Sequence, residues 1–155
     1  MQKVRLILQK KPSLFLIGAA LYIFVLYLIK WNIHPTWSAA WFILGSVIGT
    51  YFLEIAEDFF HLDPSPFRSV VFVGPFSIVS FFVVSSSGSF LAAGLVLSIF
   101  LTLVFWQLGE WMTVKHLNRW YNMVAEPVVP RVQLLIMMVT ILFFFIETLL
   151  FLRGV

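Results

Sequence analysis

The feature that most constrains this sequence is a stretch of 41 residues, from Ser69 to Gly109, that contains no Asp, Glu, Lys or Arg. Built as one α-helix, it would be about 61 Å long, roughly twice the thickness of the hydrocarbon core of a bilayer. The stretch must therefore fold back once. Segment 85–89 is rich in serine and contains a glycine, which makes it the natural position for the turn. The pattern predicts two consecutive membrane spans.

Composition supports a membrane protein and excludes several other classes. Hydrophobic residues make up 61% of the chain and charged residues 11%, whereas soluble domains carry about 25% charged residues. A water-soluble globule and a disordered chain are both excluded. The chain has no cysteine, so a disulfide framework, a thiolate nucleophile and a cysteine-ligated metal site are excluded as well. The net charge of +3 is scattered along the sequence and gives no reason to expect a nucleic-acid partner.

Three further stretches are long and apolar enough to cross a bilayer. We therefore expect an all-α, polytopic integral membrane protein with one transmembrane domain over residues 1–155. Proline residues 64 and 127 predict that the second and fourth helices continue past the membrane, to about residues 62 and 122. The five spans are expected at about 12–31, 36–56, 67–85, 89–108 and 131–152.

The distribution of basic residues predicts the orientation of the bundle. Loops on the cytoplasmic side of a membrane carry an excess of Lys and Arg. With the N-terminus in the cytoplasm and the C-terminus outside, only Lys30 and Arg153 fall on the outer side. We therefore expect an N-in, C-out protein of the cytoplasmic (inner) membrane. The basic residues on the inner side are then Lys3, Arg5, Lys10, Lys11, Arg68, Lys115, Arg119 and Arg131.

Acidic residues and histidines gather at the predicted inner ends of the second and fourth spans. In the second span the later three residues lie three, four and seven positions after Glu54, which places all four on one helix face. Carboxylates and imidazoles are ligands for a divalent metal and can also relay protons. The alternative is a solvated group of charges at the membrane surface. The candidate residues are Glu54, Glu57, Asp58, His61, Glu110 and His116.

Two further features lie inside the predicted spans. Glu147 is the one acidic residue within the fifth span, and Lys30 and Arg153 are its expected partners in an intramembrane ion pair. Gly45 and Gly49 form a small-residue pair in the second span, and such pairs let two helices approach closely. We expect this approach to be made within the chain.

No catalytic or nucleotide-binding motif is present in the sequence. The interpretation favoured by the sequence is a non-enzymatic subunit or scaffold that packs with partner helices in the lipid bilayer, in a homo-oligomer or with other membrane subunits. Two alternatives remain open. One is a cation or proton transporter or channel that uses the acidic and histidine residues above. The other is a membrane-embedded, metal-dependent enzyme that acts on a lipid or a quinone.

Overall fold

A computed structural model of the chain describes residues 13–62 and 64–154. In this part of the chain every regular element is helical. The basic residues of the first segment, which enter the orientation argument, lie outside it: they are Lys3, Arg5, Lys10 and Lys11. The elements are α2 (Ser13–Trp31), α3 (Trp37–Phe60), α4 (Val70–Ser86), α5 (Phe90–Val114), the short 3₁₀ helix η1 (Asn118–Tyr121) and α6 (Pro130–Arg153).

The lengths and composition of the helices are those of a helical membrane protein. Four of the described helices, α2, α3, α5 and α6, are long and apolar enough to cross a membrane. The fifth, α4, is also apolar but has 17 residues, and its length is about 26 Å at 1.5 Å per residue. The prediction of an all-helical chain built from apolar helices is confirmed.

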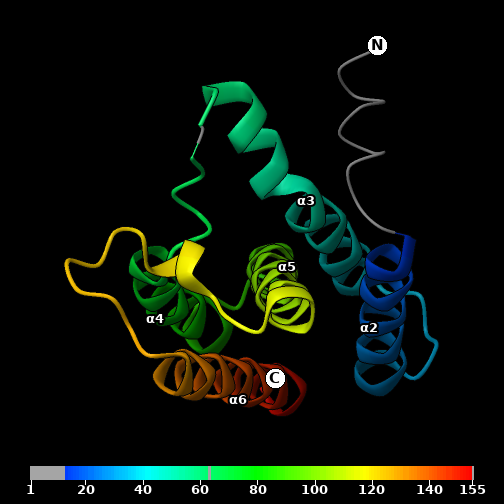
Figure 1. The fold of residues 1–155 in the computed structure, drawn as a ribbon. Helices are drawn as coiled ribbons and strands as arrows, with labels where there is room; N and C mark the ends of the chain where they lie inside the picture. The colour runs from blue at the N-terminus through cyan, green and yellow to red at the C-terminus, as the bar shows by residue number, and fades with distance from the viewer. Residues whose placement is uncertain (1–12, 63, 155) are drawn as a thin grey trace.

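Helix α5 lies at the centre of the arrangement (Figure 1). It contacts α2, α3, α4 and α6, and its contact with α3 is the most extensive in the molecule. Figure 1 shows α2 and α4 on opposite sides of α5. Successive helices run in opposite directions, so the bundle has two ends. We call them the Lys30 end, where α2 and α6 finish, and the Arg68 end, where α3 and α5 finish.

Close approach of α3 to α5 depends on three glycines. A Cβ atom added at Gly45 would lie 2.0 Å from the carbonyl oxygen of Leu91, and one at Gly49 would lie 2.3 Å from that of Leu95. Gly94 in α5 reciprocates, because a Cβ there would lie 2.3 Å from the carbonyl oxygen of Phe42. The two backbones are therefore in direct contact, as small residues at membrane helix interfaces allow.

The end of α5 differs from the prediction. This helix is predicted from the sequence to continue to about residue 122, but it ends at Val114, and Lys115 adopts a left-handed conformation with φ of 60°. The reason is tertiary. Leu117 and Trp120 are buried, with 2% and 0% of their surfaces exposed, and they join the core formed by α3, α4, α5 and α6. A straight helix would carry these side chains away from that core. Helix α3 also ends slightly early, at Phe60, with His61 left-handed.

The segment after α5 is fixed to α6 by a buried glutamine. The side-chain oxygen of Gln133 accepts a hydrogen bond of 2.6 Å from the backbone N–H of Leu117. Its side-chain nitrogen donates to Asn118 Oδ1 at 2.7 Å and to the carbonyl oxygen of Val128 at 2.8 Å. Gln133 is fully buried, and these three bonds hold the ends of the connection between α5 and α6.

Candidate functional site

The Arg68 end is organised around one arginine. Arg68 lies just before α4, and its guanidinium carbon stands 4.1 Å from the ring centroid of Trp106 in α5. Its Nε lies 3.5 Å from Oε1 of Glu57 in α3. Arg68 thereby connects the start of α4 to both α3 and α5. Stacking on an indole and pairing with a carboxylate are both favourable contacts for a guanidinium.

Three adjoining cavities have Arg68 in their walls. The first, of about 440 Å³, is mostly apolar: Phe105, Leu108 and Met112 line it together with two carboxylates, Glu54 and Glu57. The second, of about 370 Å³, is polar, and the third, of about 490 Å³, follows the end of α5. Arg119 lines both the second and the third cavity. The first cavity thus joins an apolar wall to a charged one at a single end of the bundle.

All six acidic and histidine candidates of the sequence lie around these cavities, but in different ones. Glu54 lines the first cavity and is buried, with 5% of its surface exposed. Glu57 lines the first and the second. Asp58 and His61 line the second, and Glu110 and His116 line the third. The candidate residues of α3 can lie near those of α5 only if the two helices are in contact, and this contact is present in the structure.

The partners of Glu57 and Glu110 come from the connections that follow α3 and α5. The hydroxyl of Ser65 donates a hydrogen bond to Oε1 of Glu57, the same oxygen that faces Arg68. The indole N–H of Trp120 donates to Oε2 of Glu110 at 2.9 Å. Glu57 thus holds the connection between α3 and α4, and Glu110 holds the turn after α5.

The candidate residues are not gathered into a metal centre. Among residues 13–62 and 64–154, no three His, Cys, Asp or Glu side chains are grouped so that they could hold a metal ion. Metal sites in proteins usually need at least three such ligands. The divalent-metal hypothesis for Glu54, Glu57, Asp58, His61, Glu110 and His116 therefore gains no support from the arrangement of the described side chains.

Glu147 and Lys30 have different partners from the expected ones. Glu147 is fully buried, and its Oε1 accepts a hydrogen bond of 2.6 Å from the hydroxyl of Ser80 in α4. The ammonium group of Lys30 donates to the carbonyl oxygens of Phe151 and Gly154, at 2.5 and 2.6 Å. Lys30 therefore caps the C-terminus of α6, where unpaired carbonyl groups favour a cation.

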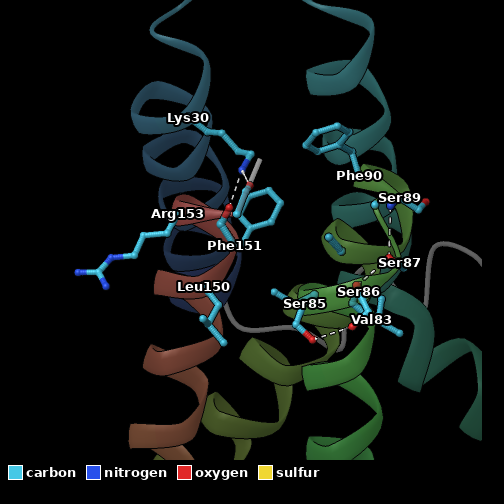
Figure 2. A pocket seen from close by; sticks show the side chains of 14 residues that line it. Lys30, Val83, Ser85, Ser86, Ser87, Ser89, Phe90, Leu150, Phe151 and Arg153 are labelled. Carbon is cyan, nitrogen blue, oxygen red and sulfur yellow. Dashed lines mark hydrogen bonds between the residues drawn. The ribbon is translucent and has the colours of Figure 1, made fainter.

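A further cavity of about 440 Å³ opens at the Lys30 end. Figure 2 shows the side chain of Lys30 reaching towards Phe151, whereas the guanidinium group of Arg153, which also lines the cavity, is directed away from the other labelled side chains. The Lys30 ammonium group also stands 4.5 Å from the ring centroid of Phe151. The serine-rich turn between α4 and α5 forms another wall, with Ser85, Ser86, Ser87 and Ser89.

Three residues that make important contacts in the structure were not singled out in the sequence: Arg68, Ser80 and Gln133. Arg68 was counted only as an orientation signal, because nothing local indicates that Trp106 will stack on it. Ser80 is one of many serines in apolar stretches. Gln133 did carry a usable signal, since a strongly polar amide within an apolar span is costly unless its hydrogen bonds are satisfied inside the protein.

Comparison of the chain with protein-family models, with characterised proteins and with solved structures finds no match. The function must therefore be argued from the sites themselves.

Proposed function

We propose that the chain is a non-enzymatic membrane protein that crosses the inner membrane five times and binds a phospholipid at its Arg68 end. The N-terminus faces the cytoplasm and the C-terminus the opposite side, so the Arg68 end is cytoplasmic. The excess of basic residues that the sequence places on that side supports this orientation. The observation that carries the lipid proposal is the position of Arg68, stacked on Trp106 at the junction of an apolar and two polar cavities.

The chemistry of the cavity walls suits the headgroup of such a lipid. A guanidinium carries five N–H donors and matches the geometry of phosphate oxygens. The contact with Glu57 is made through Nε of Arg68, so the donors on the two terminal nitrogens are the ones that a phosphate would take. Arg119 adds a second positive charge beside the same cavities.

The same walls favour a headgroup that also carries an ammonium group. Glu54 and Glu57 line the first cavity together with Arg68, so an ammonium group beside the phosphate would meet carboxylate oxygens in the same wall. A phosphoethanolamine headgroup satisfies both charges. The apolar residues Phe105, Leu108 and Met112 of the same cavity would then contact the first part of the acyl chains.

The non-enzymatic interpretation is retained, but it now depends on the lipid cavity and not on an interface with a partner helix. Gly45 and Gly49, whose close approach was expected to be made within the chain, lie against the backbone of α5 and leave this face of α3 unavailable to a partner helix. A transport path through Glu57 and Glu110 is less well supported, because both carboxylates are hydrogen-bonded within the structure. A metal-dependent enzyme is likewise less well supported, because the described candidate ligands are dispersed.

Native mass spectrometry of the detergent-solubilised protein tests the lipid proposal. Wild-type protein incubated with equal amounts of phosphatidylethanolamine and phosphatidylglycerol should retain the ethanolamine lipid in preference. Arg68→Gln removes charge-assisted hydrogen bonds that contribute about 1.5–3 kcal/mol each, so retention of this lipid should fall by about tenfold or more.

Arg131→Gln is the matched control, because Arg131 is an exposed arginine at the same end of the bundle and lines none of the three cavities. It should retain lipid as the wild type does, and a thermal melt of each variant establishes that the bundle is folded. Equal retention by folded Arg68→Gln and wild-type protein would refute the proposal.

A further inference from the structure

A buried carboxyl group inside the bundle is used by none of the contacts proposed for lipid binding. Glu147 lies in α6, with 0% of its surface exposed. Ser80 of α4 donates to its Oε1 at 2.6 Å, whereas Oε2 has no hydrogen-bond partner within the described residues. An ionisable group within a membrane span is costly to bury and is by default a candidate functional group.

The cavity at the Lys30 end is lined by residues that lie one helical turn from this carboxyl group and its hydrogen-bond donor. Its walls include Val83 and Val84 of α4 and Leu150 and Phe151 of α6. These residues lie three and four positions after Ser80 and Glu147 respectively, which is one helical turn, or about 5–6 Å along each helix. These wall residues therefore lie one turn from the Ser80–Glu147 pair, and the serine-rich turn labelled in Figure 2 forms another part of the wall.

The charged and titratable groups around Glu147 are few. Helix α4 contains none, and α5 contains only Glu110, at the opposite end of the bundle. From α2, the hydroxyl of Tyr22 is hydrogen-bonded at 2.8 Å to that of Thr148, the residue after Glu147. Lys30 is held at the C-terminus of α6, and Arg153 also lines the cavity, with its guanidinium group directed away from the other labelled side chains in Figure 2.

We propose that Glu147 is a proton-binding site that exchanges its proton with water at the Lys30 end through this cavity. Water in the cavity delivers a proton to Oε2 of the carboxylate, and the same atom returns it to water on release. Ser80 donates to Oε1 in both states and so leaves Oε2 as the atom that carries the proton. A metal cation fits less well, since calcium and magnesium take six or more oxygen ligands and no group of three metal-binding side chains exists among the described residues.

Infrared difference spectroscopy of the full chain in lipid nanodiscs tests this proposal. The C=O stretching band of a protonated carboxyl should appear as the pH is lowered, and it should shift when H₂O is replaced by D₂O. The band should be absent from Glu147→Gln, in which the amide oxygen can still accept the hydrogen bond from Ser80. Glu110→Gln, which alters an acid at the other end of the bundle, should keep the band.

Ser80→Ala provides a second readout that does not require the loss of Glu147. Removing the donor to Oε1 should move the Glu147 band to higher frequency while the band still responds to pH. A Glu147-dependent band that responds to neither pH nor D₂O would overturn the proposal, and so would the absence of any such band from the wild type. If Glu147→Gln fails to fold, the Ser80→Ala shift decides, and an unshifted band counts against the proposal.

Discussion

At the scale of single residues, glycine determines how closely the two most extensively paired helices can approach. Gly45, Gly49 and Gly94 lie where the backbones of α3 and α5 touch. Any amino acid other than glycine carries a Cβ atom, which at these positions would lie 2.3 Å or less from a carbonyl oxygen of the facing helix. The neighbouring atom is in each case part of a rigid helical backbone and cannot rotate away, as a flexible side chain could.

The contact gives a prediction with an internal control. In Gly49→Ala the new methyl group would lie 2.3 Å from the carbonyl oxygen of Leu95, so the helices must separate. Overpacking of this kind costs about 1–3 kcal/mol. Gly109→Ala is the control, because nothing lies within 4 Å of a Cβ placed there, and alanine favours a helix over glycine by about 1 kcal/mol.

Thermal unfolding in detergent, followed by circular dichroism, should therefore show a lower midpoint for Gly49→Ala and an unchanged or higher midpoint for Gly109→Ala. Equal midpoints for the two variants would mean that α3 and α5 do not approach as closely as described.

At the scale of elements, the connection between α5 and α6 shows what the sequence can and cannot predict. The charge-free stretches located the helices because an apolar run of sufficient length is a local property of the chain. The end of α5 was missed because the burial of Leu117 and Trp120 depends on helices that are distant in the sequence. Proline residues mark the latest point at which a helix can end. They do not reveal that α5 ends earlier, because that depends on apolar side chains packing back against the core.

The same distinction applies to the candidate sites. The face that carries Glu54 and Glu57 could be predicted from helical spacing. The stacking of Arg68 on Trp106 could not, because it depends on how α4 follows α3 past α5. Nor could the partners of Glu147 and Lys30 be chosen, since charge alone suggested that they pair with each other. In the structure, the partner of Glu147 is a hydroxyl group of α4, and the partners of Lys30 are the carbonyl oxygens at the end of α6.

Gln133 provides the prediction at this scale. Gln133→Leu removes three hydrogen bonds and leaves the buried N–H of Leu117 without its acceptor. An unsatisfied buried polar group costs about 1–3 kcal/mol. The loss of stability should be confined to the segment that Gln133 holds. Hydrogen–deuterium exchange should therefore accelerate in segment 115–129 and remain nearly unchanged in α3. Asn122→Leu, at an exposed position of the same segment, should exchange as the wild type does. Uniformly faster exchange across all helices would contradict this local role.

At the scale of the whole molecule, α4 must cross the membrane if the two ends of the bundle are to lie on opposite sides, as proposed. Its 17 residues span about 26 Å, somewhat less than the hydrocarbon core of about 30 Å. A short span is accommodated by local thinning of the bilayer and by flanking residues that reach the interface. Arg68, two residues before the helix, is positioned for that role. With α4 as a span, the two ends of the bundle face opposite sides of the membrane, with the proposed lipid cavity on one side and the proposed access to Glu147 on the other.

Single-cysteine labelling is the most direct test of this central claim, because the chain has no cysteine of its own. Phe60→Cys, Ser87→Cys and Met123→Cys introduce thiols at exposed positions before α4, after α4 and after α5. A membrane-impermeant maleimide should label Ser87→Cys in intact cells, and should label the other two only after permeabilisation. Labelling of Phe60→Cys and Ser87→Cys from the same side would show that α4 does not cross the membrane and would contradict the five-span account.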